Sequence, residues 1–273
     1  MFLLLISLSS CAYYLKHEEK SFLSWMRANN QFYTGDEYQI RFGIFLSNLR
    51  LIKEHNSNNK GFTVGLNRFA AYTPSEYKEF LGFRMKRAKS DAPVKSSKKK
   101  IDFSFDWRTR GIICSVKDQG QCGSCWAFSA IEAAESSYVI STGVCVLFSA
   151  QNLVDCVTTC SGCNGGLMTE AYDYVMQNQG GQFCRDDSYP YTAVEGTCKY
   201  SDAEKVGRIL RYINIEEGNE DDLCDKVKDI GPVAVAIDAS NWSFQMYSSG
   251  IYDEPSCSPT NLDHGVLLVG YGI

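Results

Sequence analysis

Two cysteines and a tryptophan lie close together in the segment QGQCGSCWAFSA, residues 119–130. From Trp126 onward apolar residues recur at helical spacing and no helix breaker follows until Gly143, so a helix is predicted to begin at Cys125 and to end at this glycine. A thiol at a helix N-terminus faces the positive end of the helix dipole and several unpaired N–H groups, which favours the thiolate. Because the thiolate attacks carbonyl carbon, Cys125 is predicted to be a nucleophile.

A nucleophile of this kind needs a base, and the chain has three histidines. His17 and His55 fall in polar, helical surroundings towards the N-terminus. His264 instead precedes GVLLVGYG, an apolar run of strand length bounded by glycines. A polar residue at the start of a strand is the structural alternative for His264, and the residues by themselves leave both interpretations open.

The segment 119–130 resembles the active-site segment of papain and the cathepsins, which is marked by a C-G-S-C-W pattern around the nucleophile. His264 follows Cys125 by 139 positions, within the interval found in papain-like enzymes. The resemblance implies that His264 forms an ion pair with the Cys125 thiolate, takes its proton and later protonates the leaving amine. It also implies that Gln119 donates a hydrogen bond to the oxyanion, beside the backbone N–H of Cys125.

The resemblance extends to residues that contact substrate. Gly165 and Gly166 in the CNGG run would bind peptide backbone, because glycine permits close approach. Four apolar residues match walls of the family's main specificity pocket, S2, and predict a preference for hydrophobic or aromatic side chains two positions before the cut. Core packing is the alternative for each. The predicted substrate-binding residues are Gly123, Gly165, Gly166, Leu167, Met168, Ala236 and Leu262.

Twelve cysteines together with an apolar N-terminus indicate an oxidising compartment. The resemblance implies two disulfides, Cys122 with Cys163 and Cys156 with Cys198. It makes Cys257 one half of a third, whose partner would lie beyond the end of this sequence. No partner is implied for Cys114, Cys145, Cys160, Cys184 and Cys224.

The cysteines allow other interpretations. Cys122 and Cys125 could be purely structural, or could form a redox Cys-x-x-Cys, although the stretch before them lacks the long apolar strand of a thioredoxin-like pattern. Cys156, Cys160 and Cys163 could bind zinc, but the sequence around them offers no second group of ligands. We therefore expect no metal and no cofactor.

The family orients its catalytic histidine with an asparagine in an N-S-W-G run, and this sequence ends at Ile273 without one. Asp263 is no substitute for it, because adjacent side chains on a strand point to opposite faces. Asn241 and Asn261 match no part of the family pattern. The sequence is therefore expected to be truncated at its C-terminus, with strand edges left exposed.

Residues 1–12 contain an apolar run followed by small residues, which favours a secretory signal peptide and is too short to span a bilayer. The expected location is the secretory pathway, with a lysosome-like compartment or the extracellular space as destination.

Residues 13–83 are predicted to form a helical propeptide. Six of its residues fall on one stripe of a helix and resemble the inhibitory propeptide of cathepsin L-like zymogens, and a shared face is explained if Glu37 and Arg41 pair internally. These six are Glu37, Arg41, Phe45, Asn48, Ile52 and Asn56. A second propeptide pattern appears as Gly65, Asn67 and Phe69. Ala71 stands where that pattern has an aspartate, which removes a carboxylate that could take part in acid-triggered release.

Residues 84–101 are predicted to be a mobile basic linker and activation region, because eight of them are Lys or Arg and few are apolar. A nucleic-acid or membrane patch is the alternative. Residues 1–100 hold 17 Lys and Arg against 8 Asp and Glu, whereas residues 101–273 hold 10 against 24. These opposite charges predict electrostatic docking of the propeptide, weakened by salt and by acid.

Residues 102–273 are expected to form a peptidase domain with a helical half, from Cys125 to about Asn178, and a β-rich half marked by residues 232–238 and 265–272. The expected fold is α+β, with the two lobes of papain preceded by a helical prodomain. The expected function is a cysteine endopeptidase made as an autoinhibited zymogen; the alternative is an inactive homologue that acts as a protease-binding or inhibitory protein. Its expected partners are protein and peptide substrates and its own propeptide, without nucleic acid or membrane, and a monomer is expected.

Overall fold

The computed structural model describes residues 16–58, 61–84 and 104–272. The predicted signal peptide, residues 85–101 of the predicted linker and the first two residues of the predicted peptidase domain lie outside them. The chain forms two compact units, Met1–Ser75 with Trp242–Glu254 and Glu76–Asn241 with Pro255–Ile273. None of the described helices is long and apolar enough to cross a membrane.

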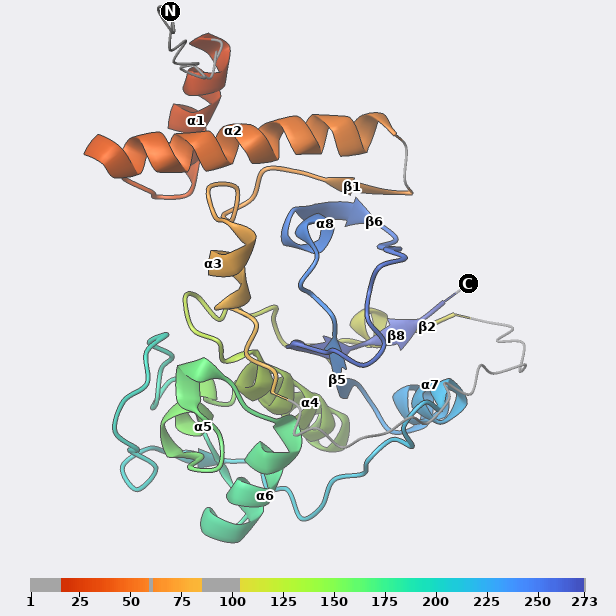
Figure 1. Ribbon diagram of the computed structural model, residues 1–273. Coiled ribbons are helices and arrows are strands. Elements are labelled where there is room, and N and C mark those ends of the chain that lie inside the picture. The colour runs from red at the N-terminus through yellow and green to blue at the C-terminus, as the bar shows by residue number, and fades with distance from the viewer. Residues whose placement is uncertain (1–15, 59–60, 85–103, 273) are drawn as a thin grey trace, which may run out of the picture. The chain divides into compact units, whose positions relative to one another are not determined.

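The first unit is built on two helices, α1 (Lys16–Ala28) and α2 (Gly35–Ser57), which cross one another (Figure 1). Asp36 and Glu37 lie in the first turn of α2, where the positive end of the helix dipole favours acidic side chains. The helices enclose a cluster of aromatic rings around Phe22, whose side chain is fully buried. The rings with centroids within 6.4 Å of Phe22 belong to Trp25, Tyr33, Tyr38, Phe42 and Phe45.

A short antiparallel ladder completes this unit and pairs Phe62 with Gly250. Gly250 has a φ of +97°, and a Cβ there would lie 2.8 Å from the backbone of Gly61 and of Phe62, so the position requires glycine. Ile52 of α2 packs on the ladder together with Met246. The elements of this part are β1 (Phe62–Val64), α8 (Trp242–Gln245) and β6 (Tyr247–Gly250).

Arg41 pairs internally within the propeptide, as the sequence pattern predicts. Its Nε lies 3.6 Å from Oε1 of Glu37, one helical turn away, and its Nη1 donates to the carbonyl of Ala71 at 3.1 Å. The guanidinium also lies over the rings of Tyr33 and Tyr72, 5.7 and 5.6 Å from their centroids. Ala71 thus meets Arg41 through a backbone carbonyl, which does not titrate as an aspartate would.

The second unit has a helical half centred on α4. Helix α4 begins at Cys125, and Gly143 follows it in the left-handed conformation and donates its N–H to the carbonyl of Val139, so both predicted ends are confirmed. Trp126 and Ile131 are fully buried in a core that α4 shares with α5 and α6. Helix α3 (Pro74–Lys78) contains the sequence boundary between the two units. The helices of the second unit are η1 (Trp107–Arg110), α4 (Cys125–Thr142), α5 (Ala150–Cys156), η2 (Gly162–Asn164), α6 (Met168–Asn178) and α7 (Glu220–Asp229).

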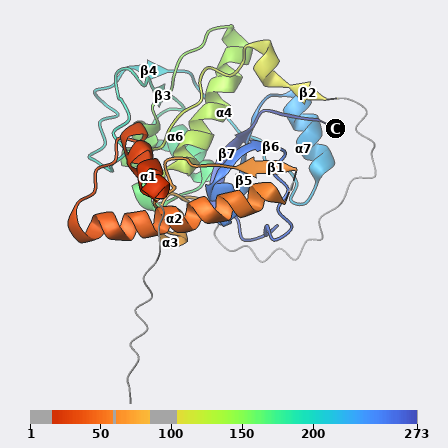
Figure 2. The ribbon, with the colours of Figure 1, turned by 90° about the horizontal axis from the view of Figure 1, so that it is seen from above.

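Helix α4 packs on the antiparallel ladder of β5 and β7, in which Ile237 pairs with His264. The Ser129 hydroxyl donates to the carbonyl of Val266 at 2.8 Å and ties the helix to β7. Strands β3 and β4 lie on one side of α4 and helix α7 lies on the other (Figures 1 and 2). The strands of this unit are β2 (Phe105–Asp106), β3 (Phe183–Cys184), β4 (Lys205–Val206), β5 (Val233–Ile237), β7 (His264–Leu268) and β8 (Gly270–Tyr271).

Three disulfides cross-link the second unit, over sequence separations of 31 to 42 residues. They join Cys114 to Cys145, Cys122 to Cys163 and Cys156 to Cys198. The second and third are the pairs that the resemblance implies, and the first joins two cysteines for which no partner was expected. Cross-links over such separations stabilise a fold by about 3–4 kcal/mol in the chain-entropy account.

These pairings correct two alternative interpretations of the cysteines. A redox pair of Cys122 with Cys125 is wrong, because Cys122 is bonded to Cys163. A zinc site at Cys156, Cys160 and Cys163 is also wrong, because two of these sulfurs are held in disulfides.

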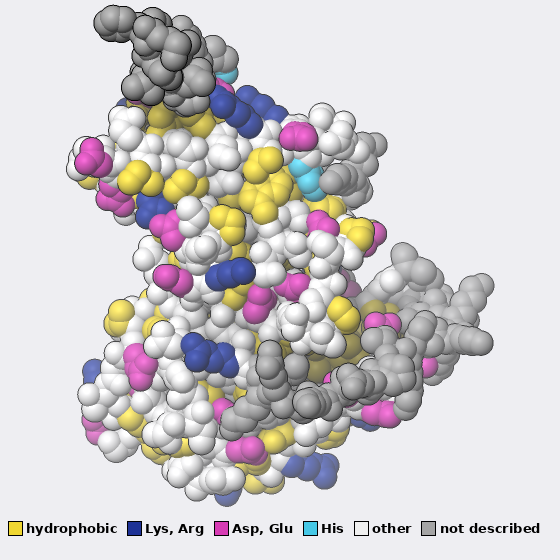
Figure 3. Space-filling model, in the orientation of Figure 1, with side chains coloured by type: hydrophobic (Ala, Val, Ile, Leu, Met, Phe, Trp, Pro, Cys, Tyr) yellow, Lys and Arg dark blue, Asp and Glu magenta, His cyan; other side chains and the backbone are white. Residues whose placement is uncertain are grey.

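Charged side chains on the face seen in Figure 3 are interspersed, with acidic and basic groups next to one another. The basic excess of the N-terminal part is concentrated in residues 84–100, of which only Arg84 is described. Electrostatic docking of the propeptide therefore stays a prediction.

Candidate active site

Cys125 is the first residue of α4 and only 1% of its surface is exposed. Its Sγ accepts a hydrogen bond from the backbone N–H of Gly265 at 3.4 Å, and the N–H groups of Gly82 and Trp126 are further backbone donors to it. Burial raises the pKa of the Cys125 thiol, and the three N–H donors offset this increase only in part. Burial of Cys125 therefore favours the neutral thiol over the thiolate.

His264 lies at the start of β7, directly before the glycine that contacts Cys125. The structure thus brings the predicted base and the predicted nucleophile to adjoining positions, one on a strand and one on a helix. Burial lowers the pKa of His264 to about 4, and its Nδ1 is buried without a hydrogen bond to any described residue. The implied thiolate–imidazolium ion pair is consequently disfavoured here, because burial favours the neutral form of both partners.

Gln119 directs its side-chain amide at the propeptide. Nε2 donates to the carbonyl of Phe80 at 2.7 Å and to the carbonyl of Cys122 at 2.9 Å. The predicted oxyanion donor is therefore occupied by a main-chain carbonyl from the C-terminal part of the propeptide.

The stretch Gly82–Arg84 is held on the site through its main chain. Gly166 donates its N–H to the carbonyl of Gly82 at 2.9 Å and accepts from the N–H of Arg84 at 3.1 Å, which makes a parallel bridge. On the other side, the N–H of Phe83 donates to the carbonyl of Asp263 at 3.0 Å. These bonds involve no side chain, so the hydrogen bonds themselves do not select residue type.

Glycine is required where this stretch approaches the site most closely. A Cβ on Gly82 would lie 1.7 Å from the carbonyl oxygen of Gly123, and one on Gly165 would lie 2.8 Å from the carbonyl oxygen of Gly82. Both distances are shorter than any van der Waals contact, so the two chains can approach only through glycines. The stretch Gly82–Arg84 therefore touches the three glycines that the resemblance makes substrate-binding residues, Gly123, Gly165 and Gly166.

The residues predicted to line S2 lie near the same place. Met168 begins α6, and a Cβ on Gly265 would lie 3.4 Å from its sulfur; Ala236 is the partner of Gly265 across the ladder. Phe83 packs on the apolar cluster that contains Met168. Leu167 directly precedes α6, and Leu262 is half-buried just before Asp263. The assignment of these side chains to a specificity pocket stays a prediction.

Asp263 uses its carboxylate away from the imidazole, as strand alternation predicts. Its Oδ1 accepts from the backbone N–H of Ala239 at 2.8 Å, and burial raises the pKa of this carboxyl group. What the sequence does not reveal is the contact of its carbonyl with Phe83, because a main-chain acceptor leaves no signal in residue type. Among the described residues, no group of three or more His, Cys, Asp and Glu side chains is placed to hold a metal ion.

Such an arrangement, a buried thiol at a helix start and a main-chain stretch of the same chain laid across it, defines a cysteine hydrolase covered by its own propeptide. Residues 101–273 match the family described as papain family cysteine protease, and residues 22–77 match the cathepsin propeptide inhibitor domain. The chain therefore belongs to the papain family of cysteine proteases and carries an inhibitory propeptide domain.

Individual relatives agree with this assignment. The chain is 41% identical over 258 residues to Cysteine proteinase 5 of Dictyostelium discoideum, covering 92% of this chain and 73% of the relative. It is 42% identical over 256 residues to Procathepsin L of Mus musculus, covering 91% and 76%. A solved structure of digestive procathepsin L 3 from the Tenebrio molitor larval midgut matches with a TM-score of 0.81 and 32% identity, covering 93% of this chain and 84% of that one. The chain spans 58% of the length of Cysteine proteinase 4 and 79% of that of Cysteine proteinase 3, both also of Dictyostelium discoideum.

Proposed function

We propose that this chain is the zymogen of a cysteine endopeptidase in which Cys125 is the nucleophile and His264 the base. The observation that carries the proposal is the main-chain stretch Gly82–Arg84, which hydrogen-bonds Gly166 and Asp263 as a bound peptide would while it covers the thiol. The proposal extends to the domain boundaries expected from the sequence: signal peptide 1–12, propeptide 13–83, linker 84–101 and peptidase 102–273.

Removal of the covering stretch is the first step of the proposed mechanism. Water then reaches the site, so the penalty that burial imposes on the charged forms of Cys125 and His264 falls. The helix N-terminus and the N–H of Gly265 then favour the thiolate, and Nδ1 of His264 is available to take the thiol proton.

Peptide hydrolysis then proceeds by acyl transfer. The Cys125 thiolate attacks the substrate carbonyl carbon, and the negative oxygen that forms is stabilised by Nε2 of Gln119 and the backbone N–H of Cys125. His264 gives its proton to the leaving amine, and a thioester remains on Cys125. Water, deprotonated by His264, hydrolyses the thioester and regenerates the thiol.

The propeptide stretch survives at the site for a geometric reason. Cys125 meets the N–H of Gly82, a hydrogen-bond donor that it cannot attack. The oxyanion donor Gln119 is meanwhile satisfied by the carbonyl of Phe80. In the covered site, the Gln119 amide is therefore not free to stabilise an oxyanion.

Acid is the proposed trigger, and His264 is a group through which it would act. Burial holds the pKa of His264 at about 4 in the covered state, against an ordinary value near 6.5 when exposed. The uncovered state therefore binds more protons between these values, and the stability of the cover is lost as pH falls from about 6.5 towards 4. Neutralisation of carboxylates on the acidic peptidase would add to this effect.

Protein and peptide substrates with a hydrophobic or aromatic side chain two positions before the cut are proposed, because Phe83 packs on an apolar cluster beside the site. We further propose passage through the secretory pathway to a lysosome-like compartment or the extracellular space, and a monomeric enzyme. The oxidising compartment is consistent with the three disulfides.

The test compares the full chain with its Cys125→Ala variant after incubation from pH 7 to pH 4. The proposal predicts that the wild-type chain loses its propeptide as pH falls and then cleaves a fluorogenic Phe-Arg amide, and that the variant does neither. Equal turnover by the variant would refute Cys125 as the nucleophile. Tight binding to other proteases without turnover would instead favour an inhibitory protein.

A further inference from the structure

Tyr191 lies next to the loop that carries the proposed oxyanion donor. Its hydroxyl donates to the backbone carbonyl of Gln119 at 2.7 Å and lies 2.6 Å from Oγ of Ser124. Because the phenolic proton is used on Gln119, the Ser124 hydroxyl is the donor in the second contact. Ser124 is fully buried directly before Cys125, so one hydroxyl connects the residue before the nucleophile with the residue that donates to the oxyanion.

The loop is anchored by disulfides at Cys114 and Cys122 and by an ion pair of Lys117 with Glu135, and Gln119 lies between the last two anchors. Residues 112–124 contain no helix or strand, and Gly120 adopts the left-handed conformation with φ of +59°. The side chain of Gln119 is held by the carbonyl of Cys122 at 2.9 Å, and the Ser124 hydroxyl lies 3.5 Å from the same carbonyl. Gln119 is therefore held at its main chain by the Tyr191 hydroxyl and at its side chain by the carbonyl of Cys122.

The segment that carries Tyr191 is itself firmly anchored. Its ring meets Phe128 of α4 edge-on, with centroids 4.8 Å apart. Two residues earlier, the carbonyl of Tyr189 accepts from Ser149 at 2.6 Å and its hydroxyl donates to Asp155 at 2.7 Å.

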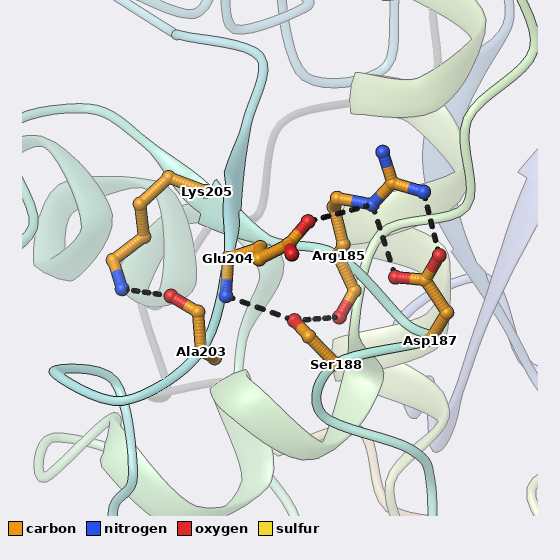
Figure 4. A network of polar contacts seen from close by, with 6 residues as sticks. All are labelled: Arg185, Asp187, Ser188, Ala203, Glu204 and Lys205. Carbon is orange, nitrogen blue, oxygen red and sulfur yellow. Dashed lines mark hydrogen bonds and ion pairs between the residues drawn. The ribbon is translucent and has the colours of Figure 1, made fainter.

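Just before this segment, a network of polar contacts joins residues 185–188 to residues 203–205, at the start of β4 (Figure 4). Arg185 binds Asp187 through two hydrogen bonds, and Ser188 accepts from the N–H of Glu204 at 3.0 Å. The phenol of Tyr191 is thus presented from a rigid support, which a positioning group requires.

We infer that Tyr191 is a positioning residue that sets the direction of the Gln119 side chain and thereby places the oxyanion donor. The inference rests on the proposed function. An oxyanion donor works when it lies about 2.7–3.1 Å from the developing charge, and loss of one such donor costs about 10²–10³ in kcat. Tyr191→Phe keeps the ring and removes the hydroxyl, so Gln119 remains but loses its fixed position, and a smaller loss, of about tenfold in kcat, is expected.

The first test is kinetic and uses the acid-activated protein. Tyr191→Phe is expected to lower kcat on a fluorogenic amide by about tenfold with KM little changed, and to raise the Ki of a peptide aldehyde by a similar factor. An aldehyde adduct places an oxyanion in the same donor set, whereas alkylation of Cys125 by iodoacetamide does not, so the alkylation rate is expected to stay at the wild-type value. A kcat equal to wild type, or an equal loss in both aldehyde binding and alkylation, overturns the inference.

Two further variants separate positioning from general loosening of the fold. Tyr172→Phe is the matched control, because its buried hydroxyl likewise donates to one backbone carbonyl, that of Ala130 in α4, at 3.0 Å. It is expected to lower the melting temperature but to leave kcat unchanged. In a Gln119→Ala background, Tyr191→Phe is expected to have no further effect on kcat, and an independent tenfold loss there overturns the inference.

A measurement on the intact zymogen needs no turnover. The side-chain amide protons of Gln119, assigned by their loss in Gln119→Ala, are expected to exchange with solvent faster in Tyr191→Phe than in wild type or in Tyr172→Phe. Unchanged exchange overturns the inference whatever the activity. If wild-type protein shows neither turnover nor an aldehyde adduct after acid treatment, the proposed function fails while the exchange result still decides the role of Tyr191.

Discussion

In the unit that contains α2, the propeptide contacts Trp242–Glu254 through side chains as well as through the β1–β6 ladder, whereas in the unit that contains α4 the stretch Gly82–Arg84 hydrogen-bonds through its main chain. Nε1 of Trp242 donates to Oδ1 of Asn48 at 2.9 Å, and Nδ2 of Asn67 donates to the carbonyl of Gln245 at 2.6 Å. The bonds of Gly82–Arg84 to Gly166 and Asp263 involve only backbone atoms.

The difference separates two tasks of the propeptide. Side-chain contacts such as those of Asn48 recognise one particular partner, because removal of either group leaves the other buried and unsatisfied. Main-chain contacts reproduce what any extended peptide offers, so they block the site in the way a substrate would occupy it. Recognition and inhibition are therefore expected to respond to different mutations.

The largest effect is expected from Gly82→Val, which attacks the main-chain contact. A Cβ at this position would lie 1.7 Å from the carbonyl oxygen of Gly123, whose own N–H donates to the carbonyl of Cys163 and holds this part of the loop in place. Overpacking of this kind costs about 1–3 kcal/mol, so activity at neutral pH without an acid step is expected to rise by about 10- to 100-fold. Progress curves of amide hydrolysis measure this rise.

Gly43→Val is the matched control for this substitution, since a Cβ on Gly43 of α2 meets nothing within 4 Å. It is expected to leave latency unchanged. Equal activation by both variants would show that Gly82 acts through general destabilisation and not through the close approach to Gly123.

Asn48→Ala tests the side-chain contact and is expected to cost about 2 kcal/mol of unfolding free energy. Asn48 is 6% exposed and bridges Trp242 to the carbonyl of Ala70, to which its Nδ2 donates at 2.9 Å, so its loss leaves two buried groups unsatisfied. Urea unfolding followed by intrinsic fluorescence measures the loss, with the exposed neighbour Ser47→Ala as control. A double-mutant cycle with Trp242→Phe that shows no coupling would contradict the proposed contact.

Glu132→Gln tests how much of the pH dependence of stability comes from the unit that contains α4. Burial raises the pKa of Glu132 in α4 to about 7, an increase that Lys117 partly offsets and that Glu135 adds to. The folded state therefore binds the proton more tightly than the unfolded state, and the stability it contributes is lost as pH rises from about 4.5 to about 7. Glu132→Gln is expected to reduce the loss of unfolding free energy between about pH 4.5 and pH 7 by about 1–2 kcal/mol, measured by unfolding at several pH values. A slope identical to that of wild type would contradict the assignment.

Phe83→Ala is expected to have the smallest effect, because the main chain and not the side chain does most of the binding at this point. Phe83 is half-buried on the apolar cluster, so its truncation is expected to cost about 1 kcal/mol, or roughly fivefold in the rate of activation. A larger effect than that of Gly82→Val, in the same progress-curve measurement, would reverse the order that the comparison predicts.

Much of the active-site framework could be predicted from the sequence. The helix that begins at Cys125 and ends at Gly143 and the strand that begins at His264 follow from periodicity and capping, and both appear in the structure. The two disulfides that the family resemblance implies appear as well. The third disulfide, Cys114 with Cys145, could not be predicted, because spacing alone does not fix which cysteines pair.

The contacts that keep the site silent are of a kind that sequence patterns do not encode. The carbonyls of Phe80 and Asp263 act through the backbone, and their residue types are not what binds. The neutral forms of Cys125 and His264 follow from burial, which only the assembled fold produces. Tyr191 gave no catalytic signal either, since a tyrosine in a loop is common and its partners lie about seventy positions away.

The most direct test of the central claim is the rate at which iodoacetamide alkylates Cys125 at pH 7 in the intact chain, resolved from the other thiols by peptide mass spectrometry. If the main chain of Gly82–Arg84 covers and neutralises the site, Cys125 in the wild-type chain reacts about 10- to 100-fold more slowly than in Gly82→Val, and Gly43→Val matches wild type. Alkylation of Cys125 at the same rate in the wild-type chain and in Gly82→Val would contradict the account.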